Sequence, residues 1–213
     1  MSWKLLFVVA ITVTFCFARL SSANEDLDQP GFKQSAEAFQ NGNYIQATRG
    51  FAELAEKNNA TAQYNYAALL FKGLGTTSDI EEAWFWAWRA KLNGIEKAGE
   101  IISDISKQLG ADNEERLIKR LVETIEPNAL DGVPAALSSL ARIYYEVPSE
   151  PSIEDSYVWS LVAQAYGQTD VQDIITYADK IMPIDSKISK QSEARKIFQE
   201  MVKVTKQNFR TKP

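Results

Sequence analysis

The chain has 213 residues, of which 45% are apolar and 24% are charged, and this is the composition of an ordinary globular protein. Its 23 basic and 28 acidic side chains give a net charge of −5, which argues against nucleic-acid binding because no surplus of cations can displace phosphate counterions. Histidine is missing and the only cysteine is Cys16, so the rest of the chain lacks the residues for histidine bases, thiol nucleophiles, disulfides and His/Cys zinc sites. We expect no metal and no cofactor.

The first 23 residues have the pattern of a signal peptide. Residues 1–4 carry one positive charge, residues 5–18 are apolar but too few to cross a bilayer as a helix, and residues 21–23 are small. We therefore expect cleavage after Ala23, a flexible leader over 24–31, and secretion across the inner membrane, into the periplasm if the chain is bacterial. An uncleaved membrane anchor is the alternative.

Apolar residues at helical spacing predict helices along the rest of the chain, and no segment alternates like a strand. Ala83, Trp86 and Ala90 share one face of a helix over about 78–93, and Asp79 is among its N-cap candidates. The preceding helix carries an apolar stripe from residue 62 and ends at Gly73. The other predicted helices cover 33–41, 43–57, 95–109, 112–126, 133–146, 152–166, 169–181 and 185–207.

The sequence also repeats itself after 73 positions. Residues 62–94 align with 135–167 without a gap, and the identical pairs include Trp86 with Trp159. A period of this length fits two helix pairs. Residues that tolerate the left-handed conformation at a helix end recur at intervals in the thirties, as Asn58, Gly94, Gly132 and Gly167. This pattern predicts an array of helix–turn–helix units over 32–182, followed by a helix and tail over 183–213.

The best unit resembles the Sel-one-like repeat, a relative of the tetratricopeptide repeat. The similarity is carried by 62–65, 72–75, Asp79, Ala83, Trp86 and Ala90. The unit from Ala135 matches less closely, since Glu146 and Pro148 replace the two loop glycines and its turn must differ. With an opening pair at 36–55 and a middle unit at 95–132, the resemblance covers 31–182. It implies an all-α fold, a right-handed α-α superhelix (solenoid) of about four helix-turn-helix units with a C-terminal capping helix.

The resemblance also implies a function, that of a non-enzymatic scaffold or adaptor for protein–protein interaction at the cell envelope. Its partner would be another envelope or secreted protein, held in a groove that the first helix of each unit lines. A stacked array offers such a groove without any catalytic residue. The expected groove residues are Tyr64, Asn65, Ala68, Phe71 and Lys72, then Glu100, Ile101, Asp104 and Lys107, then Leu137, Ser138, Ala141, Tyr144 and Tyr145. The alternative for single positions is structural, with Phe71 and Tyr144 in the core and Asn65 merely solvated.

The aromatic cluster of Trp84, Phe85, Trp86 and Trp88 allows two interpretations. These side chains point around more than half of a helix. The simpler interpretation is that they pack against neighbouring helices on two sides. The other is that Trp84 or Trp88 reaches the surface as an interface anchor. Exposed Trp and Tyr would suit a second function, that of a carbohydrate-interacting accessory protein of polysaccharide export or cell-wall remodelling. Neighbouring carboxylates diverge by about 100° around a helix, so we expect no catalytic pair.

The last predicted helix combines an apolar stripe with many basic residues. Ile197, Met201 and Val204 form the stripe, and lysines and arginines surround it. We expect this helix to cap the exposed end of the array. Docking on a partner or on a membrane surface is the alternative, because the helix is basic within an acidic protein.

Overall fold

The structure, a computed structural model, describes residues 31–148 and 150–210, with the backbone alone for 205–210. Every regular element in these ranges is an α-helix, as predicted. The chain divides between Gln108 and Leu109 into two compact units, and this division falls inside the segment that the sequence predicts as one repeat domain. The predicted signal peptide and all but the last residue of the predicted leader lie outside the described residues.

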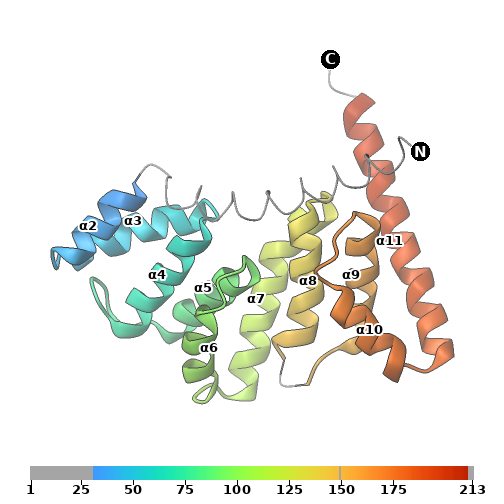
Figure 1. Ribbon diagram of the computed structural model, residues 1–213, viewed down its shortest axis with the longest axis horizontal. Helices are drawn as coiled ribbons and strands as arrows, with labels where there is room; N and C mark the ends of the chain where they lie inside the picture. The colour runs from blue at the N-terminus through green and yellow to red at the C-terminus, as the bar shows by residue number, and fades with distance from the viewer. Residues whose placement is uncertain (1–30, 149, 211–213) are drawn as a thin grey trace, which may run out of the picture. The chain divides into compact units, whose positions relative to one another are not determined.

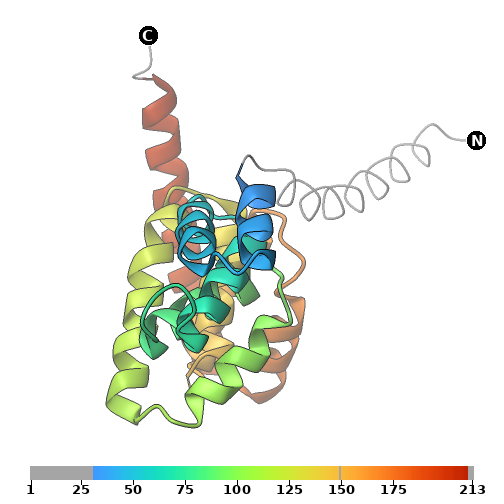
Figure 2. The same ribbon diagram turned by 90° about the vertical axis from the view of Figure 1, so that its left-hand side faces the viewer.

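Each unit is built from helices that pack against their neighbours along the chain, an arrangement compatible with a helical-repeat solenoid (Figures 1 and 2). In unit 1, each helix packs against the next: α2 (Phe32–Gln40), α3 (Tyr44–Glu56), α4 (Ala60–Lys72), α5 (Ile80–Leu92) and α6 (Ala98–Ser106). Unit 2 contains α7 (Ala111–Leu130), α8 (Pro134–Glu146), α9 (Ile153–Ala165), α10 (Gln172–Ile181) and α11 (Ile184–Arg210). There, α8 packs between α7 and α9, and α9 also contacts α10 and α11.

The two hairpins α4–α5 and α8–α9 reproduce the sequence repeat. Helix α5 covers 80–92 and α9 covers 153–165, so both of their ends lie 73 positions apart. Burial follows the same register, since Trp84 and Tyr157 are each 1% exposed and Trp86 and Trp159 are each 8% exposed. Equivalent positions therefore have equivalent structural roles in the second helix of each hairpin.

The residues predicted to end helices do so in the left-handed conformation. Asn58 has φ 65°, and Gly94, Gly132 and Gly167 also have positive φ. At Asn58 the side chain adds a second role. Its Oδ1 accepts hydrogen bonds from Gln63 Nε2 at 3.1 Å, from an Arg89 guanidinium nitrogen at 3.0 Å and from Asn93 Nδ2 at 3.1 Å. One turn residue after α3 is thus tied to both α4 and α5.

The turn between α4 and α5 depends on close backbone contact with α3. Gly73 and Gly75 both have positive φ, and Thr48 Oγ1 donates a hydrogen bond to the Leu74 carbonyl at 2.8 Å. A Cβ atom at Gly75 would overlap the Tyr44 carbonyl. The equivalent turn in unit 2 differs as predicted, because α8 continues through Glu146 and ends at Val147 in a right-handed conformation.

Some predicted helix ends were wrong. The segment 112–126 was expected to stop before Pro127, but α7 continues to Leu130. A proline in the last turns removes one backbone hydrogen bond but already has a helical φ, and the fully buried Ala129 helps to hold the final turn. Helix α6 is shorter than the predicted 95–109, since it covers only Ala98–Ser106.

The core of the α4–α5 hairpin is aromatic. The Tyr66 ring of α4 lies 5.7 Å from the Trp86 ring of α5, and the Arg89 guanidinium lies 5.1 Å from that indole. The fully buried Ala83 and Ala90 flank Trp86 on the same face, so α4 can approach while the indole fills the space between the helices. Within the described ranges, none of the helices is both long enough and apolar enough to span a membrane.

We predict that Gly75→Ala lowers the free energy of unfolding by more than about 2 kcal/mol, because the added methyl group meets backbone atoms that cannot move without disturbing α3. Gly99→Ala is the control. Gly99 lies in α6 with open space around its Cβ position, so alanine there should stabilise by about 0.5–1 kcal/mol. Urea unfolding of both variants tests the pair, and equal stability of the two would contradict the proposed role of the turn.

We predict that Trp86→Ala costs about 3–5 kcal/mol, since it empties a buried site between two helices. Tyr177→Ala serves as the control because Tyr177 is 44% exposed and its truncation leaves no closed cavity. Thermal unfolding followed by circular dichroism gives both values. A Trp86→Ala protein as heat-resistant as the parent would show that the indole is not part of the core.

Candidate functional site

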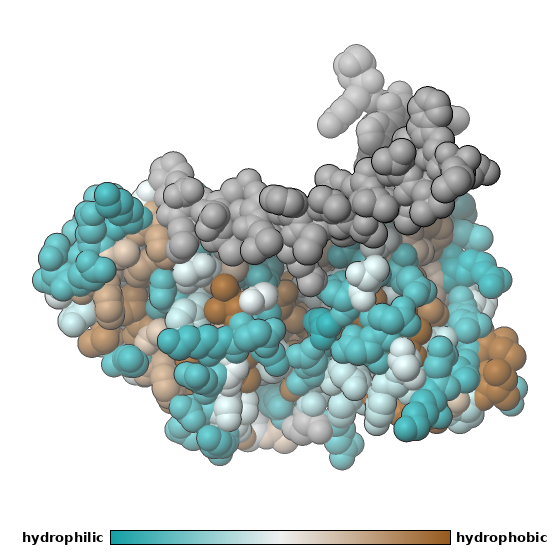
Figure 3. Space-filling model, viewed as in Figure 1, coloured by the Kyte–Doolittle hydropathy of each residue, from teal (hydrophilic) through white to brown (hydrophobic). Residues whose placement is uncertain are grey.

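Unit 1 contains a pocket of about 220 Å³ that involves α2, α3, α4 and the turn after α4. Most of its wall is apolar, and its polar members are Gln40, Asn65 and Lys72. Figure 3 shows apolar surface at the end of unit 1 that α2 and α3 form. The lining residues are Phe32, Ala36, Phe39, Gln40, Phe51, Asn65, Ala68, Leu69, Lys72 and Leu74.

The pocket exists because small residues face large ones at this junction. Ala36 on α2 and Ala68 on α4 leave space that the neighbouring side chains do not fill. Phe32 and Phe51 meet edge to face, with their ring centroids 5.6 Å apart, and this contact fixes one part of the wall. Phe39 is 43% exposed, although a ring of this size is ordinarily covered. The apolar surface therefore extends to the mouth of the pocket.

The α4 side of the pocket carries the polar groups at regular helical spacing. Asn65, Ala68 and Lys72 follow one another at i, i+3 and i+7 and so share one face of α4. Within the described part of the chain, the side chains of Gln40, Asn65 and Lys72 make no hydrogen bond or ion pair. The two amides can each donate and accept, and the lysine can bind a carbonyl or carboxylate oxygen.

The volume of the pocket limits what it can hold. Sites for drug-sized ligands have about 300–1,000 Å³, whereas an apolar cavity of about 150 Å³ accepts one benzene molecule. A pocket of about 220 Å³ therefore suits one aliphatic or aromatic side chain. Asn65 and Lys72 on α4 add hydrogen-bonding groups to this mostly apolar wall.

Three of the five groove residues predicted in the best unit line this pocket, namely Asn65, Ala68 and Lys72. Tyr64 and Phe71 are half-buried and do not line it. The Lys97 ammonium group stands 5.7 Å from the Tyr64 ring centroid, so Tyr64 belongs to the contact between α4 and the start of α6. Phe71 is thus neither fully buried nor part of the pocket wall, whereas Asn65 is part of that wall.

The residues predicted on α6 form a different surface. Glu100 and Asp104 line an open hollow together with Lys97, while Lys107 is exposed and pairs with Asp104 at 3.2 Å. Ile101 is only 9% exposed and contributes to the core. None of these four residues lines the pocket between α2 and α4.

In unit 2, most of the predicted groove residues are covered by other parts of the chain. The groove positions inferred by adding 73 to those of α4 are therefore corrected. Leu137 and Ala141 are fully buried, and Ser138 is 4% exposed. Ser138 Oγ donates a hydrogen bond to Asp170 Oδ1 at 2.9 Å, in the segment that leads into α10. Tyr144 is half-buried, as is Tyr145, whose ring packs on Tyr177 of α10 at 5.9 Å.

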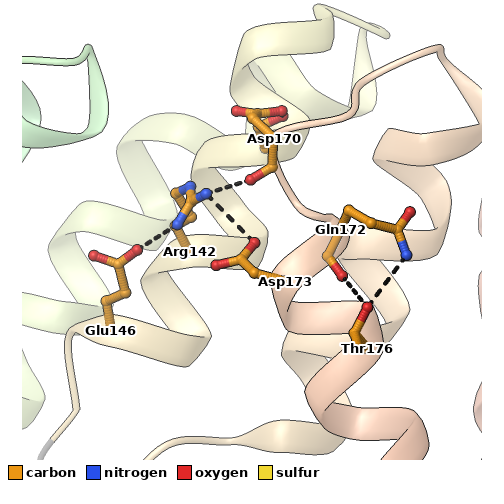
Figure 4. A network of polar contacts seen from close by, with 7 residues as sticks. Arg142, Glu146, Asp170, Gln172, Asp173 and Thr176 are labelled. Carbon is orange, nitrogen blue, oxygen red and sulfur yellow. Dashed lines mark hydrogen bonds and ion pairs between the residues drawn. The ribbon is translucent and has the colours of Figure 1, made fainter.

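Arg142 holds this cover in place (Figure 4). Its guanidinium donates to Glu146 of its own helix at 2.6 Å, donates to the Asp170 carbonyl and pairs with Asp173 at 3.6 Å. Burial by itself lowers the pKa of Arg142, but the hydrogen bond to Glu146 and the charges of Glu146, Asp173 and Asp170 raise it above the ordinary value. In this hairpin the face equivalent to the pocket side of α4 is a structural contact.

The tryptophans of the described chain are all buried. Trp84, Trp88 and Trp159 are 1%, 4% and 8% exposed, so the core interpretation of the aromatic cluster is confirmed and a surface role for Trp84 or Trp88 was wrong. Trp84 Nε1 donates to Ser106 Oγ of α6 at 3.2 Å. Helix α5 packs on both α4 and α6, and these two neighbours explain how a helix with aromatic residues on several sides is covered.

Sequence reasoning missed the contribution of α2 to the pocket. Phe32, Ala36, Phe39 and Gln40 fall at helical spacing, and this signal was sufficient to place them on one face. Their relation to Asn65 depends on how α2 packs in unit 1, which spacing does not show. No group of three or more acidic or cysteine side chains that could hold a metal ion occurs among the residues that the structure describes.

Comparison with models of known protein families finds none that matches the chain. Comparison with curated proteins finds no relative either.

We predict that Arg142→Gln lowers the free energy of unfolding by about 1–3 kcal/mol, because it leaves Glu146 and the Asp170 carbonyl without their half-buried partner. Lys119→Gln is a matched control, since Lys119 also pairs with a glutamate four residues ahead but is 75% exposed. That change should cost less than about 0.5 kcal/mol. Urea unfolding distinguishes the two, and similar small losses would show that Arg142 does not secure α10.

Proposed function

We propose that this chain is an exported, non-enzymatic scaffold or adaptor of the Sel-one-like and tetratricopeptide-like type. In this proposal it binds an extended segment of another envelope or secreted protein. The observation that carries the proposal is the α2–α4 pocket, where an apolar wall adjoins the polar side chains of Gln40, Asn65 and Lys72. Export and a periplasmic location rest on the pattern of residues 1–23 alone.

Recognition would use one apolar anchor and its flanking backbone. The anchor side chain leaves water for the wall formed by Phe32, Phe51 and Leu69. The amide of Asn65 pairs with a peptide N–H or C=O group without reading the next side chain, and Lys72 binds an acceptor oxygen nearby. Such a site is selective for the presence of a large apolar residue and tolerant of its neighbours.

The expected affinity of this pocket alone is low. Burying one large apolar side chain contributes about 1.5–3 kcal/mol, whereas a dissociation constant of 1 mM requires about 4 kcal/mol. Two or three hydrogen bonds of about 1 kcal/mol each bring the sum into the range of weak, reversible binding. This is the range that suits an adaptor whose partner must be released.

The geometry favours a peptide over a sugar. Stacking on a carbohydrate needs broad, accessible aromatic faces, but Trp84, Trp86 and Trp88 are buried in α5. The aromatic rings at the pocket are phenylalanines, and Phe32 meets Phe51 edge to face instead of forming a flat row. The tryptophans of unit 1 therefore offer no stacking surface for the carbohydrate function expected as the alternative.

We predict that Asn65→Ala combined with Lys72→Ala weakens peptide binding at least tenfold without changing helicity. The ligand is found by selecting a random-sequence peptide library on the chain, and affinities are then measured by titration. Selected peptides should share one large apolar residue, and Ala68→Trp, which fills the pocket, should also abolish their binding. Asn128→Ala with Lys57→Ala is the control, because both residues are exposed and neither lines the pocket.

Two results would contradict the proposed function. One is a set of selected peptides that bind the folded double variant and the Ala68→Trp variant as tightly as the parent chain. The other is the absence of any enriched peptide after selection on a chain whose circular dichroism confirms its helical fold.

A further inference from the structure

The turn between α10 and α11 exposes more large apolar surface than a solvated helix corner requires. Ile184 is 65% exposed and Ile188 is 59% exposed, and both lie in the first turns of α11. On α10, Tyr177 and Ile181 are 44% and 48% exposed at i and i+4. Figure 3 shows the resulting hydrophobic patch at this corner of unit 2. The peptide pocket lies in the other unit, so this surface is a separate one.

One face of α11 is occupied by contacts with α9. Lys190 pairs with Glu193 at 3.1 Å and with Glu154 at 3.7 Å, and Gln191 Nε2 donates to the Tyr157 hydroxyl at 3.1 Å. Ala194 and Met201 are buried on the same side. This is the contact expected of a capping helix, and it gives the charge of Lys190 its partners within the chain.

The opposite face carries cations that this packing does not explain. At about 100° per residue, Arg195, Lys196 and Lys203 fall on the same side of α11 as Ile184 and Ile188, away from Met201. All three basic side chains are exposed, and none of them forms an ion pair within residues 31–148 and 150–204. The whole of α11 has seven basic and three acidic residues in a chain of net charge −5.

We propose that this outer face of α11, with the isoleucine corner at its start, docks on the surface of an anionic lipid bilayer. The isoleucines enter the interface between headgroups and acyl chains, and the cations lie against the anionic headgroups. The acidic remainder of the chain is repelled by the same surface, so charge orients the protein with α11 toward the lipid.

The chemistry of the face separates a bilayer from a second copy of this chain. In a two-fold pairing the same surface meets itself, and Arg195 and Lys196 would then face like charges. Four apolar side chains are also far fewer than the 20–30 residues a side that a stable interface of about 800 Å² per partner uses. A bilayer offers apolar depth and negative charge together and needs no complementary shape.

The test is co-sedimentation of the full chain with vesicles of phosphatidylcholine alone or mixed with phosphatidylglycerol. Binding should require the anionic lipid and weaken with added salt. Replacing Arg195, Lys196 and Lys203 together by Gln should lower the partition coefficient about a hundredfold, since each cation near such a surface contributes about fivefold. Ile184→Ser with Ile188→Ser should lower it at least about tenfold.

Matched controls use exposed residues elsewhere on the chain. Replacing Lys33, Lys57 and Lys119 together by Gln removes the same charge, and Ile45→Ser removes an isoleucine that is 74% exposed on α3. Neither change should alter vesicle binding.

A local probe keeps the test valid if residues 1–30 themselves bind lipid. In a chain with Cys16→Ser, an environment-sensitive fluorophore is attached at Ser192→Cys on the outer face of α11, or at Ser103→Cys on α6 as the control. Anionic vesicles should shift the emission of the first to the blue and leave the second unchanged. The proposal is overturned if anionic vesicles leave the probe at Ser192→Cys unshifted, if neutral vesicles shift it equally, or if the shift persists in the Gln variant. The proposal is also overturned if the parent chain forms a dimer that the isoleucine variant loses while vesicle binding stays intact, because the face would then be a self-association surface.

Discussion

The aromatic surface of α5 imposes the constraint on which the rest of unit 1 depends. Trp84 and Trp88 share one side of the helix, with their rings 5.9 Å apart, and Trp86 points to another side. A helix that is apolar on several sides is stable only with neighbours on more than one of them. Helix α4 supplies one neighbour and α6 another. Once α4 is fixed against α5, its remaining face turns toward α2 and α3, and the pocket forms there. The position of the candidate site thus follows from the burial of residues that take no part in it.

In unit 2 the equivalent aromatic residues are buried in the same way, but a different segment covers the first helix of the hairpin. Tyr157 and Trp159 of α9 are as buried as their counterparts in α5, and α8 packs beside them as α4 does in unit 1. The free face of α8, however, is closed by the segment that enters α10, and Arg142 fixes that segment through Asp170 and Asp173. Leu69 is the residue of α4 that corresponds to Arg142 in the 73-residue repeat. An apolar residue leaves this face of α4 available to form a pocket wall, whereas an arginine recruits carboxylates and seals the face.

This difference explains how far the sequence could predict the structure. Helices and their ends are local properties, so the positive φ at Asn58 and Gly94 and the bounds of α5 and α9 followed from spacing and turn chemistry. Asn65 and Lys72, expected in a groove by the same reasoning, line the pocket beside α4. Leu137 and Ala141 are buried instead, because the repeat transfers a residue's place on its helix but not the identity of the element that covers it. The cover of α8 depends on side-chain pairing across about thirty residues, which no periodicity reveals.

The proposed membrane surface on α11 would compensate for the low affinity of the proposed peptide pocket. A pocket that holds one apolar side chain supports only low affinity in free solution, because the energy of a single anchor barely offsets the entropy lost on association. If α11 also confines the protein to a lipid surface, a partner attached to the same membrane is present at a raised effective concentration, and no new contact is needed. The unpaired cations of α11 would then contribute to capture without touching the peptide. Lys190 belongs to the same helix but pairs with Glu154 and Glu193 in its packing against α9. The structure distinguishes it from the outer cations, whereas a count of charges along the sequence cannot.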